Sequence, residues 1–248
     1  MAQIPIALQL YSVRDDCAKD FPGTLKAVAE MGYRGVEFAG YYNYSAPQIR
    51  KMMDDLGLEA AGTHTSLESL LGDELPRAVE FNRVLRNRFL IIAYQKRESR
   101  AQWVELARSL NEIAARLALE EMQTGYHNHW HEFEPTEGEL PWDTVIANTG
   151  PTVVMQMDTG NSLQGGADAV QFLEKYPGRA ITVHVKEYTP KNDQALIGEG
   201  EVRWAEVLRL CRTTAGTQWY IVEQERYAYP PLECARRNLA NLRKLLGE

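Results

Sequence analysis

Short runs with the composition of β-strands alternate with amphipathic stretches along the whole chain. Eight such runs are present, at Ile4–Tyr11, Gly35–Phe38, Ala60–Thr65, Phe89–Tyr94, Met122–His129, Val153–Asp158, Ala180–Lys186 and Trp219–Gln224. Their length and apolar character predict strands. Because a predicted helix follows each of them, the strands are expected to run parallel.

Apolar residues at three- and four-residue steps predict the helices between these strands. In the clearest one, Ser99 can cap a helix whose apolar face carries Trp103, Leu106 and Leu110. Prolines near the expected helix starts and glycines just past the ends support the pattern. These residues are Pro22, Pro47 and Pro76, and Gly32, Gly57 and Gly216.

Eight strand–helix units in 248 residues are typical of a closed barrel. We therefore predict an α/β fold, a single-domain (β/α)₈ TIM barrel over residues 1–248. The alternative is an open, doubly wound sheet. Such a sheet usually has a glycine-rich phosphate turn after its first strand, and Tyr11-Ser-Val-Arg-Asp15 contains no glycine.

The net charge and the cysteines indicate which partners and which cellular compartment are expected for this protein. The net charge of −7 argues against nucleic acid or an anionic membrane as the main partner. Cys17, Cys211 and Cys234 lie far apart, which favours reduced thiols in a cytoplasmic protein. The N-terminus lacks a basic region and is not expected to be a signal peptide. No apolar run approaches the ~20 residues that a membrane-spanning helix needs.

Chemistry in a parallel barrel lies at the carboxyl ends of the strands, so the residues there are the candidates for function. Those residues are Glu37, His64, His127-Asn-His129, Asp158, His184 with Lys186, and Glu223. Side chains on a strand alternate faces. His127 and His129 are therefore expected to share one face, and so are His184 and Lys186.

Ligand-type side chains at the ends of four consecutive strands, the fifth to the eighth, predict a metal site. A lone histidine there is more often structural, and a lone Asp-Thr-Gly is often a turn or a helix cap. Four such residues are expected on the same face of the barrel, which favours a metal site over separate structural roles. Buried carboxylates there need a cation or hydrogen-bond partners to stay ionised. Two histidines and two carboxylates suit one divalent ion such as Mn²⁺, Zn²⁺ or Co²⁺.

Six motifs in this order resemble the xylose-isomerase-like barrel superfamily of sugar isomerases, epimerases and endonuclease IV relatives. They are Leu8-Gln-Leu-Tyr-Ser-Val-Arg14, Gly35-Val-Glu-Phe38, Gly125-Tyr-His-Asn-His129, Met157-Asp-Thr-Gly-Asn161, His184-Val-Lys-Glu187 and Ile221-Val-Glu223. Members of that superfamily hold their metal with Glu, Asp, His and Glu from strands five to eight. The resemblance thus implies Asp158, His184 and Glu223 as ligands, with His127 at the position of the first glutamate.

A histidine in place of the first glutamate changes which reaction is expected. Epimerases of the superfamily use two opposed glutamates, and here only Glu223 remains, which argues against a strict two-glutamate epimerisation. The Tyr-His-Asn-His signature is similar to that of keto-inositol dehydratases and of enzymes acting on 3-keto-glycosides. Proton abstraction beside a metal-polarised carbonyl fits both groups. A histidine can carry that proton near neutral pH, and the candidates are His129, expected above the ion, and His64.

Endonuclease IV needs three metals and many histidines, and its sixth-strand motif has a histidine where this chain has Asn161. A DNA-repair role is therefore not expected.

Several further residues are candidates for contact with a carbohydrate. Aromatic side chains after strands two and five, Trp130 among them, can stack on a sugar ring or simply pack the rim. Glu37, Lys186 and Arg14 are candidates for substrate binding, with ion pairs as the alternative for each of the two basic residues. Glu132-Phe133 is expected to begin a lid, and Glu225 to support the site from behind.

The sequence therefore predicts a metal-dependent sugar isomerase or epimerase acting on a small sugar or keto-sugar. The alternative enzyme is a lyase or dehydratase on a 3-keto-glycoside or keto-inositol. A barrel that binds metal and sugar without turnover is the alternative of a different class. A homo-oligomer is compatible with the sequence.

Overall fold

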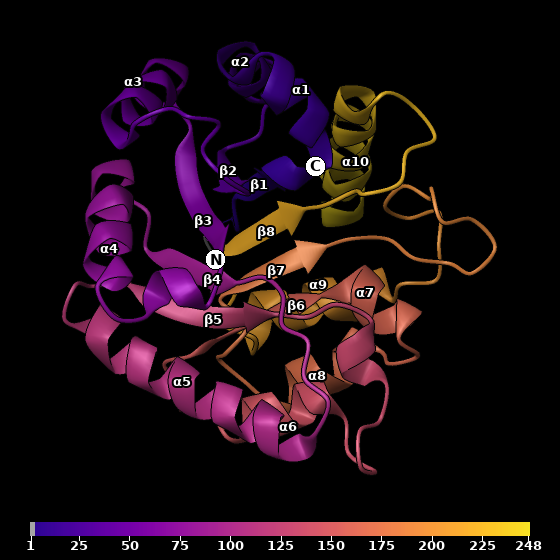
Figure 1. The fold of residues 1–248 in the computed structure, drawn as a ribbon. Coiled ribbons are helices and arrows are strands. Elements are labelled where there is room, and N and C mark those ends of the chain that lie inside the picture. Colours follow the sequence, from indigo (N-terminus) through magenta and orange to yellow (C-terminus); the bar gives the residue numbers. More distant parts are fainter. Residues whose placement is uncertain (1–2) are drawn as a thin grey trace.

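In the computed structural model, which describes residues 3–248, eight parallel strands close into a barrel in the order β1 to β8. The strands are β1 Ile6–Gln9, β2 Gly35–Phe38, β3 Glu59–Thr65, β4 Phe89–Ile92, β5 Gln123–His127, β6 Val154–Asp158, β7 Thr182–Val185 and β8 Trp219–Val222. Figure 1 shows them at the centre of a ring of helices. The predicted (β/α)₈ barrel is confirmed, and the open sheet is excluded.

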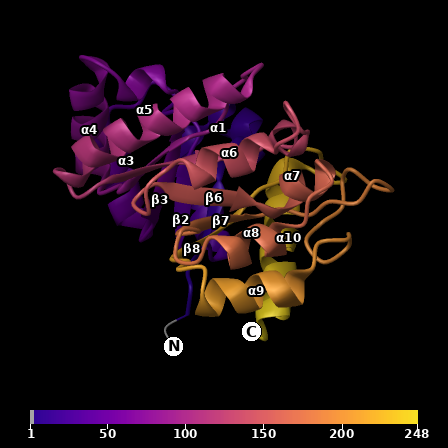
Figure 2. The same cartoon turned by 90° about the horizontal axis from the view of Figure 1, so that it is seen from below.

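The surrounding helices are α1 Arg14–Lys19, α2 Phe21–Met31, α3 Ala46–Leu56, α4 Glu74–Leu85, α5 Arg100–Ala118, α6 Pro141–Ala147, α7 Thr159–Gln164, α8 Ala169–Lys175, α9 Trp204–Thr213 and α10 Pro231–Leu246. Short 3₁₀ helices lie at η1 Leu10–Val13, η2 Glu68–Leu70 and η3 His131–Phe133. Figure 2 shows α8, α9 and α10 against the outside of the barrel. Among residues 3–248, no helix combines the length and apolar character needed to cross a membrane.

The strands divide their side chains between two cores. Outward-facing residues such as Leu8, Val36 and Met155 pack under the helices in the larger apolar cluster. A smaller cluster fills the amino-terminal half of the barrel interior and consists of Ala7, Ala61, Phe89, Ile91, Val154, Trp219 and Ile221. Two residues further along the strands, the inward positions become polar. The barrel is therefore plugged at one end and carries its chemistry at the other.

Strand ends are where the structure differs from the sequence prediction. The fifth, seventh and eighth strands stop before His129, Lys186 and Glu223, which the predicted runs included. Beyond β5 and β8, side chains take over the hydrogen bonds of the ladder: Asn128 bonds the backbone of Asp158, and Ser12 Oγ accepts the backbone N–H of Gln224. The three functional candidates thus lie on the first residues of loops.

The Ser99 cap was predicted correctly, since its side chain accepts the Gln102 N–H at the start of α5. Gly32 and Gly57 end α2 and α3 with left-handed backbone, as expected.

Gly35 allows Trp219 to fill the amino-terminal end of the barrel. A Cβ atom at Gly35 would lie 2.6 Å from the Glu59 carbonyl oxygen and 2.9 Å from the Trp219 ring. We expect Gly35→Ala to lower the free energy of unfolding by about 1–3 kcal/mol, because overpacking forces neighbours to move. Urea denaturation followed by tryptophan fluorescence measures this change.

Gly150→Ala is the matched control, since the nearest atom to a Cβ there is Asn111 Oδ1 at 3.6 Å. It should change stability by less than about 1 kcal/mol. Equal losses in the two variants would contradict the steric explanation.

Candidate metal centre and active site

Four side chains that could ligate a metal ion meet at the carboxyl end of the barrel. They are His127 at the end of β5, Asp158 at the end of β6, His184 on β7 and Glu223 directly after β8. Each offers one donor atom, and these atoms all lie within 4.8 Å of one another. All four side chains are buried. The sequence motifs therefore converge in space on one cluster.

Two atoms of this cluster lack a hydrogen-bond partner. His127 Nδ1 and Asp158 Oδ2 are buried, and neither bonds any group of the described chain. His184 Nδ1 lies 2.6 Å from Glu223 Oε2 and 3.9 Å from Asp158 Oδ2. Leaving a buried polar atom without a partner costs about 1–3 kcal/mol. A divalent cation would satisfy these atoms, and the donor set of two histidines and two carboxylates fits Zn²⁺, Mn²⁺ or Co²⁺.

Glu37, from β2, lies below the cluster and is fully buried. Its Oε2 atom is 2.7 Å from His184 Nε2 and accepts a hydrogen bond from Gln9, while Gln156 donates to Oε1. Gly62 makes room for the carboxylate, since a Cβ there would lie 2.5 Å from Glu37 Oε1. A carboxylate behind a metal-ligating histidine fixes which ring nitrogen faces the ion. In this case the ring presents Nδ1 to the other ligands.

The network around Glu37 brings in two residues that sequence reasoning missed. Gln9 and Gln156 each lie two residues after an inward apolar residue, Ala7 and Val154, so the two-residue period of a strand was the available signal. Glu37 itself was expected to contact substrate. Its oxygens are occupied by interior partners, which favours a positioning role.

Burial and neighbouring charges shift the pKa values of these groups strongly. Burial disfavours the charged imidazolium of His184, but Glu37 and Glu223 outweigh it and raise its pKa to about 10. Burial, reinforced by Glu223, raises the pKa of Asp158 to about 7 against the opposing effect of Lys186. Without a metal ion, the cluster therefore holds protons near neutral pH.

Two further histidines border the cluster. His64 Nε2 lies 2.7 Å from Gln156 Oε1 and 3.1 Å from Glu37 Oε2. The His129 ring stands edge-on to His127, with centroids 5.0 Å apart, and burial lowers its pKa to about 3. His64, His127, His129 and Glu223 line one cavity of about 500 Å³ together with Tyr11 and Tyr94. Both predicted proton carriers thus reach the same space as the cluster.

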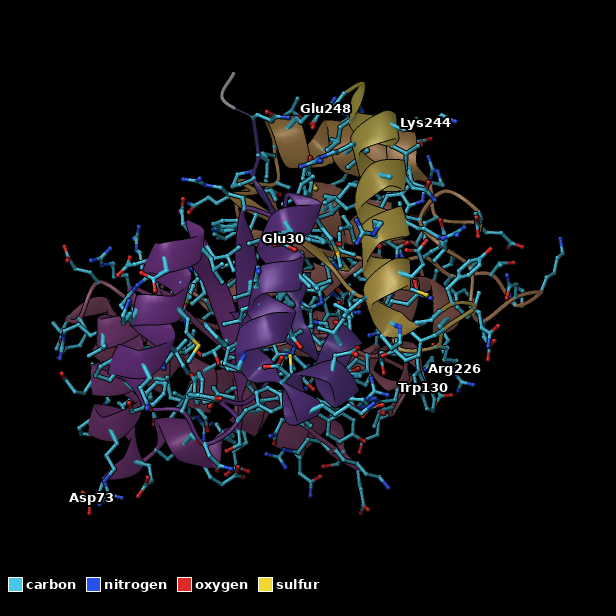
Figure 3. The ribbon with its side chains drawn as sticks, turned by 90° about the horizontal axis from the view of Figure 1, so that it is seen from above. Glu30, Asp73, Trp130, Arg226, Lys244 and Glu248 are labelled. Atoms are coloured by element: carbon cyan, nitrogen blue, oxygen red, sulfur yellow. The ribbon has the colours of Figure 1, made fainter. Side chains whose placement is uncertain are left out.

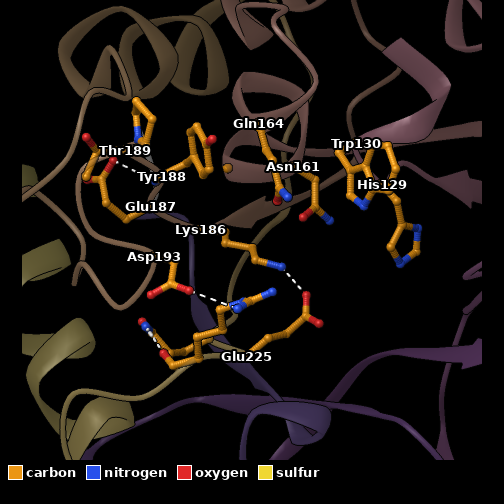
Figure 4. Close-up of a pocket in the computed structure, with 14 residues that line it drawn as sticks. His129, Trp130, Asn161, Gln164, Lys186, Glu187, Tyr188, Thr189, Asp193 and Glu225 are labelled. Carbon is orange, nitrogen blue, oxygen red and sulfur yellow. Dashed lines mark hydrogen bonds and ion pairs between the residues drawn. The ribbon is translucent and has the colours of Figure 1, made fainter. Parts of the chain in front are cut away.

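A second cavity, of about 320 Å³, adjoins the first and shares His129 and Glu225 with it. Figure 4 shows Lys186 at its centre, with Trp130, Asn161 and Gln164 on one side. Lys186 Nζ lies 3.4 Å from Glu223 Oε1 and forms a second ion pair with Glu225. Trp130 and Arg226 both line this cavity, and Figure 3 labels them at the end of the molecule away from Glu248. Lys186 and Trp130 are therefore within reach of a ligand.

Arg14 lines neither cavity. Its guanidinium donates to the Tyr227 hydroxyl and to the Tyr11 carbonyl, and it stacks on the Tyr11 ring. It braces one wall of the larger cavity through Tyr11.

The expectation of a lid at Glu132-Phe133 was wrong. Both side chains are buried, and η3 is held against the barrel because Glu132 accepts hydrogen bonds from the Tyr126 hydroxyl and the His129 N–H. Glu132 and Phe133 are therefore anchored against the barrel and line neither of the two cavities.

With this geometry in place, comparison with known proteins identifies the class. The model of the xylose isomerase-like TIM barrel family matches residues 25–245, and the chain belongs to that family. The resemblance inferred from the motifs is thereby confirmed. Proteins similar to this chain include an inosose dehydratase of Clostridium tetani and, among solved structures, an L-ribulose 3-epimerase.

One curated relative is an inosose dehydratase of Geobacillus kaustophilus, 26% identical over 66% of this chain and 60% of its own length. Among solved structures, a sugar phosphate isomerase/epimerase from Parabacteroides distasonis superposes with a TM-score of 0.81 at 23% identity, covering 98% of this chain and 96% of its own. The IolI protein, whose structure contains a bound zinc atom, superposes with a TM-score of 0.75 at 12% identity over 98% of both chains.

Metal binding should release protons and strengthen as the pH rises. His184 and Asp158 must lose their protons to ligate an ion, so protonation competes with the metal. We expect the affinity for Zn²⁺ to increase between about pH 6 and pH 9, measured by isothermal titration calorimetry in buffers of different ionisation enthalpy. Asp158→Asn should weaken binding at every pH. An affinity independent of pH would show that these groups are not the ligands.

Proposed function

We propose that this chain is a divalent-metal-dependent enzyme that removes the proton next to the carbonyl group of a keto-sugar or keto-inositol. The observation that carries this proposal is the buried cluster of His127, Asp158, His184 and Glu223, two of whose atoms lack partners, at the floor of a cavity that two further histidines enter. The zinc in IolI and the inosose substrate in the name of the dehydratase relative support it.

The roles of the residues follow from their positions. His127, Asp158, His184 and Glu223 would hold the ion, which would act when bound as a Lewis acid toward the oxygen atoms of the substrate. Glu37 holds His184 in orientation from below.

His129 lines the cavity beside the cluster, and burial keeps its imidazole uncharged by lowering its pKa to about 3, so the ring is free to take up a proton from a bound substrate. Lys186, held between Glu223 and Glu225, carries a positive charge that can bind a substrate oxygen.

Of the two fates for the deprotonated substrate, we favour loss of a β-leaving group. Glutamates that line the larger cavity, within the described residues, are Glu223 and Glu225, and both follow β8. They cannot act from opposite faces of a substrate as a pair of epimerase glutamates does. The dehydratase relative supports the same outcome.

Reprotonation, which would make the enzyme an isomerase or epimerase, is the second candidate. His129 follows β5 whereas Glu223 follows β8, so two proton-transfer groups approach the cavity from different strands.

Solvent deuterium tests the proposal and separates the two fates. The Zn²⁺-, Mn²⁺- or Co²⁺-loaded protein is incubated in D₂O with inosose and with ketopentoses, and the products are followed by NMR. Deuterium at the carbon next to the carbonyl is expected in recovered substrate wherever the deprotonation reverses, and in the product only if the deprotonated substrate is reprotonated there. A dehydrated product indicates elimination, whereas a labelled epimer or isomer indicates reprotonation. Metal-loaded protein that neither labels nor dehydrates any of these compounds would favour the non-catalytic barrel.

His129→Asn should leave metal affinity unchanged and reduce the rate of deuterium exchange by roughly 10²–10⁴-fold. The reason is that the asparagine retains hydrogen bonding but cannot accept a proton. Calorimetry with Zn²⁺ is the control. Loss of metal in this variant would mean that His129 is a ligand and that His127 takes the other role.

A further inference from the structure

Two buried polar side chains next to the cluster, Asn128 and Glu132, are candidates neither for metal ligation nor for contact with substrate. Asn128 is fully buried and lies between His127 and His129. Glu132, also fully buried, follows on η3. Neither lines either of the two cavities. Their hydrogen bonds nevertheless end on residues that the proposed reaction uses.

Asn128 holds Asp158 by both of its backbone groups. The side-chain Nδ2 donates to the Asp158 carbonyl over 3.1 Å, and Oδ1 accepts the Asp158 N–H over 2.8 Å. This pair reproduces the hydrogen bonds that a neighbouring strand would supply, at the point where β5 has ended. The Asn128 carbonyl is in turn fixed by Asn161 Nδ2, and the Asp158 carboxylate caps Asn161. The direction of the Asp158 side chain therefore depends on the Asn128 amide.

Glu132 holds the backbone of His129 in the same way. Its Oε2 accepts the His129 N–H over 2.8 Å, and its Oε1 accepts the Tyr126 hydroxyl over 2.5 Å. Tyr126 is itself packed between Trp103 and Trp142 in the outer core. The turn that carries His129 is thus tied to a rigid part of the barrel.

We propose that Asn128 and Glu132 are positioning residues with separate targets: Asn128 sets the metal ligand Asp158, and Glu132 sets the proton-transfer residue His129. This inference rests on the proposed function, and it predicts that the two side chains can be separated by experiment. Asn128 variants should lose metal affinity. Glu132 variants should bind metal normally and lose turnover.

The chain contains a matched control for Asn128. Asn87 is equally buried, and its amide makes the same pair of bonds to the backbone of Phe89, with both distances 3.1 Å. Phe89 begins β4 at the opposite end of the barrel from the cluster. A substitution at Asn87 therefore has a comparable structural cost without touching the site.

The first experiment compares Asn128→Asp with Asn87→Asp by calorimetry with Zn²⁺ and by the visible spectrum of bound Co²⁺, which reports coordination geometry. The aspartate keeps the acceptor and loses the donor, and its charge alone would strengthen cation binding. If Asn128 positions Asp158, Asn128→Asp should instead bind Zn²⁺ roughly 10–100-fold more weakly than the unsubstituted protein. The spectrum of bound Co²⁺ should also change. Asn87→Asp should lose stability only.

Asn128→Leu, which removes both bonds without adding charge, repeats the test. Unchanged or tighter binding in the folded Asn128 variants would overturn the role of Asn128. If the unsubstituted protein bound no metal, the proposed function itself would fail, which is a different result.

The second experiment compares Glu132→Met, which removes both acceptors, with Glu132→Gln, which retains one for the His129 N–H. In Glu132→Met, amide hydrogen exchange over residues 128–133 should be faster, and deuterium transfer to inosose or a ketopentose should fall roughly tenfold or more at unchanged Zn²⁺ affinity. Glu132→Gln should restore most of both properties. Unchanged exchange in Glu132→Met, or loss of metal in that variant, would overturn the role of Glu132.

Discussion

The buried hydrogen bond between the Glu37 carboxylate and His184 is the interaction on which the rest of the site depends. A carboxylate in a protein interior carries a desolvation penalty of several kcal/mol, so it needs partners that favour its charge. Burial opposes ionisation of Glu37, but its electrostatic interactions and hydrogen bonds with the His64 and His184 imidazoles hold its pKa below its ordinary value. The amides of Gln9 and Gln156 complete its shell.

Several features of the barrel accommodate the Glu37 carboxylate. Gly62 leaves the space that it occupies, and the pairing of β2 with β3 shifts register between Val36 and Glu37. Below it, the buried apolar cluster around Trp219 fills the barrel interior. Above it, His184 presents Nδ1 to Glu223. The interior thus changes from apolar to ionic within one pleat repeat of the strands.

Carboxylates also organise the loops around the site. Glu187, after β7, accepts hydrogen bonds from the backbone of Gly198 and Val202 and from the Trp204 indole, and it folds the loop that forms one wall of the smaller cavity. Gly200 has no side chain that would meet this carboxylate. Glu132 performs the equivalent task after β5. Loops that are anchored by buried acids hold their functional residues more rigidly than loops that rely on surface contacts.

The barrel could be predicted from the sequence alone, because strand and helix periods are local properties that repeat eight times along the chain. The sequence also determined which residues stand at the strand ends, and therefore the set of His127, Asp158, His184 and Glu223, since parallel strands place their carboxyl ends on one face. The residues that support these four side chains became visible only in the folded barrel. That Glu37 faces the interior, that Gln9 and Gln156 support it, and that Asn128 and Glu132 hold their neighbours are matters of side-chain direction and contact between distant strands. A one-residue change in where a strand ends alters that direction, and no local pattern fixes it.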